Sequence, residues 1–131
     1  MPQLITETTS YPGEWLKHEA ESWYSRQDIT LLGAVGADKV ILSGTVLGKI
    51  TASGKYVPLV PGAADGSQTA VGILFITNTV PVAVDVRAAM IARDAIVSDN
   101  GIKWPAGITA PQISTATAQL VALGILVREG A

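Results

Sequence analysis

Cysteine is absent from this chain of 131 residues, and other chemically active residue types are scarce. Without cysteine the protein has no disulfide bond, no thiolate nucleophile and no thiolate metal ligand. Histidine occurs once, as His18 between Lys17 and Glu19. A lone histidine without a fixed carboxylate partner is a poor general base, and without cysteine it does not fill a tetrahedral zinc site. We therefore expect no catalytic residue, no metal and no cofactor, and predict that the protein is not an enzyme.

Charged residues are also few: they make up 15% of the chain, against roughly a quarter in an average soluble domain. The net charge is −2, and no two basic residues are adjacent. A nucleic-acid partner requires a concentrated cationic face that displaces counterions from phosphates, so we predict no such partner.

Long hydrophobic runs are missing as well. The longest unbroken apolar stretch covers residues 70–76, which is too short to span a bilayer. The first residues lack the basic region and the apolar core of a signal peptide. We expect no membrane partner and synthesis in the cytoplasm.

Aliphatic residues, in contrast, are abundant. Hydrophobic residues make up 48% of the chain, and the mean hydropathy is +0.37. A domain of this size buries roughly two-thirds of its extended surface, so it supports a core of its own. With so few charges on a small body, the composition indicates a permanent oligomer, and a well-filled monomer is the alternative.

The pattern from residue 27 onward predicts a mainly β domain over residues 27–131. A hairpin is expected around Gly54, because two β-forming runs flank a short loop that contains it. We predict an irregular stretch over 94–107, and then one short helix that starts near Pro111 and stops before Gly124. The predicted strands cover residues 28–33, 40–42, 44–51, 55–60, 71–77 (covered on both faces), 82–90 and 125–127.

Residues 1–26 differ from the rest and are predicted to form an N-terminal arm, partly disordered in the free protein. Leu16, Ala20 and Trp23 allow a short, marginal helix. The segment is too polar to build a core, so its large aromatic side chains must pack on another surface. We predict a partner surface for Tyr11 and Trp15, and either a partner or their own domain for Trp23 and Tyr24.

The chain from about residue 20 to its end resembles the gpD-like head decoration proteins of tailed bacteriophages. The resemblance rests on the order and spacing of several segments rather than on one motif. These segments are Trp23–Arg26, the hairpin Gly44–Pro58, Asp65–Leu74, the sequence Lys103-Trp104-Pro105, and Gln119–Val127.

This resemblance implies a compact β-clip-like domain that forms a homotrimer on the outer surface of the expanded head. There it binds the major capsid protein and stabilises the shell against internal DNA pressure. The arm would order on the capsid by strand addition, for which the extended Leu4-Ile5-Thr6 is suited. The residues expected to bind the capsid are Leu4, Ile5, Thr6, Tyr11, Trp15, Leu16, Trp23 and Tyr24. Trp104 and Pro105 are expected to anchor the core or the trimer interface.

Two other classes of function compete with this interpretation. The first is a small ligand- or carbohydrate-binding β module in which Trp104 and Tyr56 form a stacking platform. It requires both aromatic rings to be exposed on one face of the domain. The second is an enzyme, which the scarcity of reactive side chains disfavours.

Overall fold

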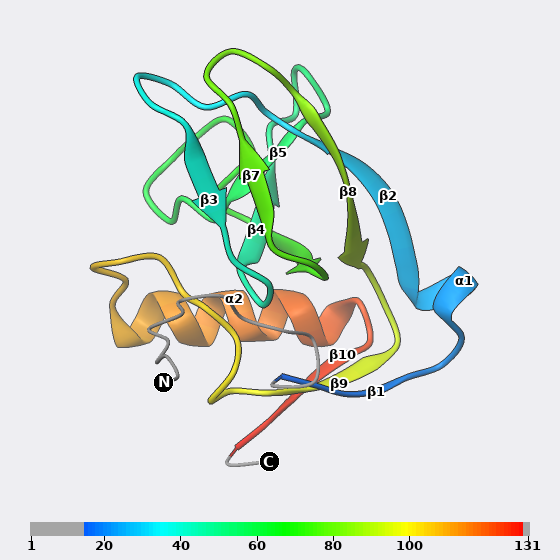
Figure 1. The fold of residues 1–131 in the computed structure, drawn as a ribbon. Helices are drawn as coiled ribbons and strands as arrows, with labels where there is room; N and C mark the ends of the chain where they lie inside the picture. The colour runs from blue at the N-terminus through cyan, green and yellow to red at the C-terminus, as the bar shows by residue number, and fades with distance from the viewer. Residues whose placement is uncertain (1–14, 130–131) are drawn as a thin grey trace, which may run out of the picture.

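The computed structural model describes residues 15–129, and these residues form the predicted mainly β fold with one longer helix (Figure 1). The strands are β1 (Leu16–Glu19), β2 (Arg26–Leu31), β3 (Lys39–Ile41), β4 (Val46–Lys49), β5 (Tyr56–Pro58), β6 (Ala70–Leu74), β7 (Asn78–Val80), β8 (Val86–Ile91), β9 (Ala95–Ser98) and β10 (Ile125–Arg128). The helices are the single turn α1 (Ser22–Ser25) and α2 (Ala110–Ala122).

Five strands close into a small barrel in the order β2-β5-β4-β6-β8, and β8 pairs with β2 to complete it. The predicted hairpin is confirmed, since β4 and β5 pair antiparallel. Gly54 adopts a φ of 73° in its loop, and the Ile50 amide donates a hydrogen bond to the Lys55 carbonyl over 2.9 Å. A two-stranded sheet of β3 and β7 completes the upper part of the molecule.

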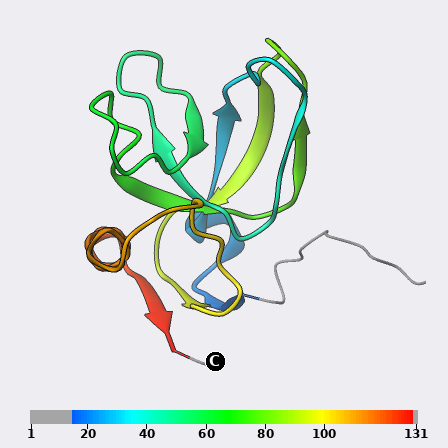
Figure 2. The same ribbon diagram turned by 90° about the vertical axis from the view of Figure 1, so that its left-hand side faces the viewer.

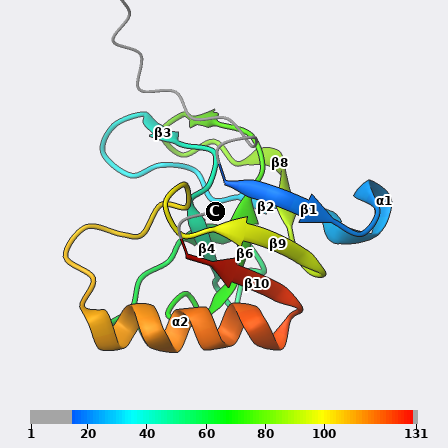
Figure 3. The same cartoon turned by 90° about the horizontal axis from the view of Figure 1, so that it is seen from below.

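A second layer lies beneath the barrel and is formed by a three-stranded sheet and α2 (Figures 1 and 2). In this sheet β9 is central, antiparallel to β1 and parallel to β10. Seen from below, α2, β10, β9 and β1 lie side by side (Figure 3). The layer therefore joins the N-terminal part of the described chain to its C-terminal part.

Two hydrophobic clusters form the core, and the strands between them are covered on both faces. One cluster joins the barrel to the lower layer and includes Trp15, Ile73 and Leu120. The other gathers barrel side chains such as Leu74 with residues of β3 and β7. Because side chains alternate along a strand, Ile73 and its neighbour Leu74 reach different clusters. This confirms a strand buried on both faces as far as Leu74, whereas Ile76, in the last part of the predicted strand, is exposed.

Helix α2 begins and ends where the sequence predicts. Thr109 caps its N-terminus: the Thr109 hydroxyl accepts a hydrogen bond from the Gln112 amide, and the Gln112 side chain accepts one from the Thr109 amide. Pro111 occupies the first turn, where its missing N–H is not needed. Gly124 follows the helix with a φ of 85°. This capping box fixes the Gln112 side chain, which matters for the pocket described below.

Three sequence-based predictions about elements were wrong. The stretch 94–107 is not wholly irregular, because residues 95–98 form β9, the central strand of the lower sheet. Residues 16–19 form β1, because pairing with β9 supplies the backbone hydrogen bonds, and the short helix that the sequence allows is limited to the single turn α1. The strand predicted over 82–90 starts only at Val86. Val82 and Val84, which the predicted strand includes, are exposed in a loop before it.

Candidate interaction surfaces

Trp15 is the first described residue, and it anchors the N-terminal segment in the core. Its side chain is fully buried, and its Nε1 donates a hydrogen bond to the Ser43 hydroxyl over 2.9 Å. The Ser43 hydroxyl in turn donates to the Phe75 carbonyl over 2.6 Å. Gly44 leaves room for the indole, since a Cβ there would lie 2.9 Å from the Trp15 ring. This differs from the prediction that Trp15 contacts a partner surface.

The residues after Trp15 pack on the domain rather than extending away from it. Leu16 is half-buried against the core cluster that joins the barrel to the lower layer, and β1 pairs with β9. Tyr24 is exposed, and the Arg93 guanidinium lies 5.5 Å from the centre of its ring. Arg93 also donates a hydrogen bond to the Tyr24 carbonyl. Of the predicted capsid-binding residues, Tyr24 is thus the described aromatic side chain that stays accessible.

The remaining predicted arm residues lie outside what the structure describes. Leu4, Ile5, Thr6 and Tyr11 precede residue 15, and the side chain of Trp23 is not described. Their capsid-binding role therefore stays a prediction.

Trp104 and Pro105 occupy the loop that leads from β9 to α2. Trp104 is half-buried and packs against the cluster that joins the barrel to the lower layer. Backbone hydrogen bonds fix this loop to the barrel: the Lys103 amide donates to the Gly44 carbonyl over 2.7 Å, and the Val46 amide donates to the Lys103 carbonyl over 3.1 Å. Pro105 is half-buried as well. A contact of either residue with another protomer stays a prediction.

Tyr56 and Trp104 do not form the stacking platform that a carbohydrate site would use. Tyr56 is buried among the barrel side chains, whereas Trp104 packs on the lower cluster. The two rings therefore belong to different parts of the core.

Exposed aliphatic side chains gather at the end of the barrel, on the loops 32–38 and 81–85. Val35 is 93% exposed, and Val82 and Val84 are 42% and 52% exposed. The loops are joined by two backbone hydrogen bonds between Ala34 and residues 81 and 83. At Gly33 a Cβ would lie 2.5 Å from the Val84 amide nitrogen, so only glycine permits this approach. We call these exposed valines the apolar tip. Sequence reasoning missed it because it placed Val82 and Val84 in a strand and made no prediction for Val35.

Asp85 forms an ion pair with the β4–β5 hairpin. Its carboxylate contacts the Lys55 ammonium at 2.6 Å and accepts a hydrogen bond from the Gly33 amide. The hydrogen bond from Lys55, followed by that from Gly33, lowers the pKa of Asp85 below its usual value. Arg87 lies 3.8 Å from Asp28 on the exposed surface. Asp85 therefore ties the apolar tip to the β4–β5 hairpin.

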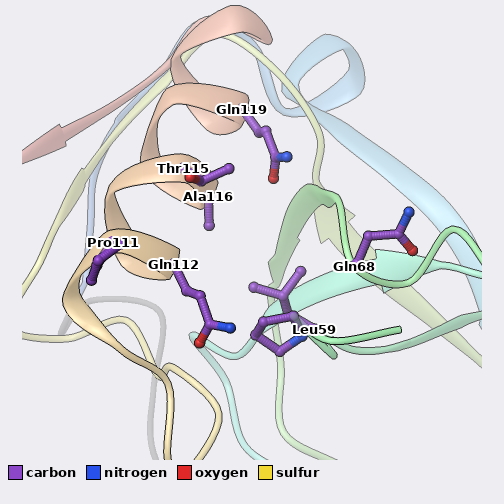
Figure 4. Close-up of a pocket in the computed structure, with 8 residues that line it drawn as sticks. Leu59, Gln68, Pro111, Gln112, Thr115, Ala116 and Gln119 are labelled. Atoms are coloured by element: carbon purple, nitrogen blue, oxygen red, sulfur yellow. The ribbon is translucent and has the colours of Figure 1, made fainter. Parts of the chain in front are cut away.

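A pocket of about 280 Å³ lies between α2 and the loop that joins β5 to β6. Gln112, Thr115 and Gln119 line it from the helix, and Gln68 lines it from the loop (Figure 4). Buried Leu59 and Ala116 also contribute to its lining. The pocket carries no charged and no aromatic side chain, and sequence reasoning did not predict it.

The comparison with known proteins decides the family. The model of the family described as "Bacteriophage lambda head decoration protein D" matches residues 5–125, which is most of the chain. The chain belongs to this family. A search of curated proteins found no match.

Family membership makes this chain a structural protein of the phage virion that decorates the head. Within residues 15–129, no group of three or more histidine, cysteine, aspartate or glutamate side chains could hold a metal ion. Nor does that part of the chain contain a helix of sufficient length and apolar character to cross a membrane.

Proposed function

We propose that this decoration protein assembles as a homotrimer on the outer surface of the expanded head, where it binds the major capsid protein. It stabilises the shell there against the pressure of the packaged DNA, without catalysing a reaction. The observation that carries this proposal is the family match over residues 5–125. The protein is made in the host cytoplasm and functions in the virion.

The position of Trp15 supports an arm that starts immediately before it. Residues 1–14 precede a side chain that is locked in the core by packing and by its hydrogen bond to Ser43. Fourteen extended residues reach roughly 45–50 Å, which is longer than a small domain is wide. We therefore place the capsid-binding arm at residues 1–14, shorter than the 26 residues predicted from sequence.

The exposed aliphatic surface supports self-association. The apolar tip presents several valines to solvent in a chain with only 15% charged residues. Contact with other copies would remove this surface from water. Three arms on one trimer then bind the shell with avidity, so each contact can be weak while the whole stays attached.

The test is addition of the protein to expanded, undecorated heads, with bound protein measured by co-sedimentation. We expect the full chain to bind, and a variant that lacks residues 2–13 to remain folded but bind at least tenfold more weakly. Light scattering of both free proteins should give the mass of a trimer. Equal head binding by the two proteins would rule out the arm as the main contact, and absence of binding by the full chain would rule out the function.

A further inference from the structure

The three glutamines of the α2 pocket are held in one orientation each. The Gln119 side-chain oxygen accepts a hydrogen bond from the Ala70 amide over 2.8 Å, and that of Gln112 accepts one from the Thr109 amide over 3.0 Å. The Gln68 oxygen accepts one from the Gly66 amide over 2.9 Å. Because each side-chain oxygen accepts a hydrogen bond from a backbone N–H, the positions of the oxygen and the nitrogen in each amide are defined. Each NH₂ group is then left without a hydrogen bond to the described part of the protein.

These NH₂ groups are donors without acceptors. Among residues 15–129 none of the three glutamine nitrogens makes a hydrogen bond. Gln112 and Gln119 extend from the helix toward Leu59 and Gln68 on the facing loop (Figure 4). The pocket thus combines several amide donors with an apolar floor of Leu59 and Ala116.

This combination selects the chemistry of a ligand. A carboxylate or phosphate would call for a cationic side chain, and none lines the pocket. A sugar ring would call for an aromatic stacking surface, which is also missing there. Main-chain carbonyls of an extended peptide can accept hydrogen bonds from the glutamine NH₂ groups, and a small apolar side chain can pack on Leu59 and Ala116.

We propose that the α2 pocket binds an extended, uncharged segment of the major capsid protein, a proposal that rests on the proposed function. Interfaces between permanently associated copies are more apolar than this pocket, whose free donors suit a partner met after folding. Two residues of the pocket, Leu59 and Ala116, belong to the core cluster that joins the barrel to the lower layer, so the pocket is built on the rigid part of the domain.

Replacing glutamine by glutamate tests the donors without disturbing the fold. In the double variant Gln112→Glu and Gln119→Glu, each carboxylate keeps an oxygen for its backbone N–H, but it offers no NH₂ and repels carbonyl oxygens. The control variant Ser114→Glu and Ala118→Glu adds the same charge at exposed helix positions outside the pocket. We expect the first variant to bind expanded heads at least tenfold more weakly, and the control to bind as the full chain does.

A cross-link identifies the occupant. Because the chain has no cysteine, Thr115→Cys places the only thiol at the pocket, and Ser114→Cys places it elsewhere on α2. Each variant is labelled with a thiol-linked photo-crosslinker, bound to heads and irradiated, and the attached peptides are identified by mass spectrometry. We expect a capsid-protein peptide from the Thr115→Cys variant and none, or a different one, from the control.

The outcomes separate the pocket from the overall function. If the full chain binds heads and the double glutamate variant binds equally well, the pocket proposal is overturned while the decoration role stands. A cross-link to a second copy of this chain, or a changed mass of the free glutamate variant, would also overturn it by making the pocket a contact between protomers. Failure of the full chain itself to bind heads would instead reject the proposed function.

Discussion

Replacing Trp15 by alanine should destabilise the folded domain strongly, because the structure buries this side chain completely. Truncating a buried tryptophan to alanine typically costs about 3–5 kcal/mol, from lost burial and from the cavity left behind. Loss of the hydrogen bond from Nε1 to Ser43 adds no separate penalty for an unsatisfied donor, because the Ser43 hydroxyl still donates to the Phe75 carbonyl. This loss is a large share of a typical stability of about 5–15 kcal/mol.

Urea denaturation followed by far-UV circular dichroism measures this effect. With a slope of about 1.5 kcal/mol per molar urea, the midpoint should fall by roughly 2–3 M. All proteins are compared at one concentration, because the stability of an oligomer depends on concentration. Trp15→Phe, which keeps much of the packing but not the N–H, should give an intermediate loss.

Deletion of residues 2–13 is the matched control. It removes the arm but keeps Trp15, so its urea midpoint should equal that of the full chain. A deletion that extends to Tyr24 should destabilise the domain, because it also removes Trp15 and β1. A midpoint for Trp15→Ala within about 0.5 M of the full chain would refute the assignment of Trp15 to the core.

Three further predictions follow from particular contacts. Gly48→Ala should lower the free energy of unfolding by about 1–3 kcal/mol, because the new Cβ would collide with the Ser67 backbone. Gly62→Ala is the control, since open space surrounds Gly62, and its urea midpoint should equal that of the full chain. Equal midpoints for the two variants would contradict the close approach at Gly48. Asp85 has a lowered folded pKa, so its stabilising effect is present above its unfolded pKa near 3.8 and is lost as the pH falls through the folded value. Urea midpoints should therefore drop less between pH 7 and pH 3 in Asp85→Asn than in the full chain, and identical drops would argue against the contacts with Lys55 and Gly33. Val35→Glu should preserve the circular dichroism spectrum but reduce the mass measured by light scattering below that of three 13.6-kDa chains, and an unchanged trimer would exclude the apolar tip as the contact between protomers.

Local sequence signals predicted the elements whose hydrogen bonds are made with near neighbours. The β4–β5 hairpin depends on Gly54, and α2 depends on Pro111 and Gly124. Such signals act within a few residues, so they can be read from a single sequence. The family was recognised on the same basis, from the order of several segments along the chain, and the family match over residues 5–125 confirmed it.

Elements that depend on distant partners were missed. β9 is a strand because β1 and β10 lie on its two sides, although one comes from near the start of the chain and the other from its end. Val82 and Val84 alternate like strand residues, but Ala83 adopts a φ of 60° where the loop meets Ala34. Hydrophobic periodicity in the sequence does not predict such long-range contacts.

The fold class, the family and the scarcity of reactive side chains could all be predicted from the sequence, because composition and local turn chemistry are properties of the chain. Only the tertiary structure shows that Trp15 belongs to the core, because its hydrogen bond to Ser43 and its packing on Gly44 join residues far apart in the chain. It also decided that three glutamines from two elements share one pocket with their oxygens engaged and their nitrogens free. Such sites arise from long-range contacts, which fix orientations that residue identity leaves open.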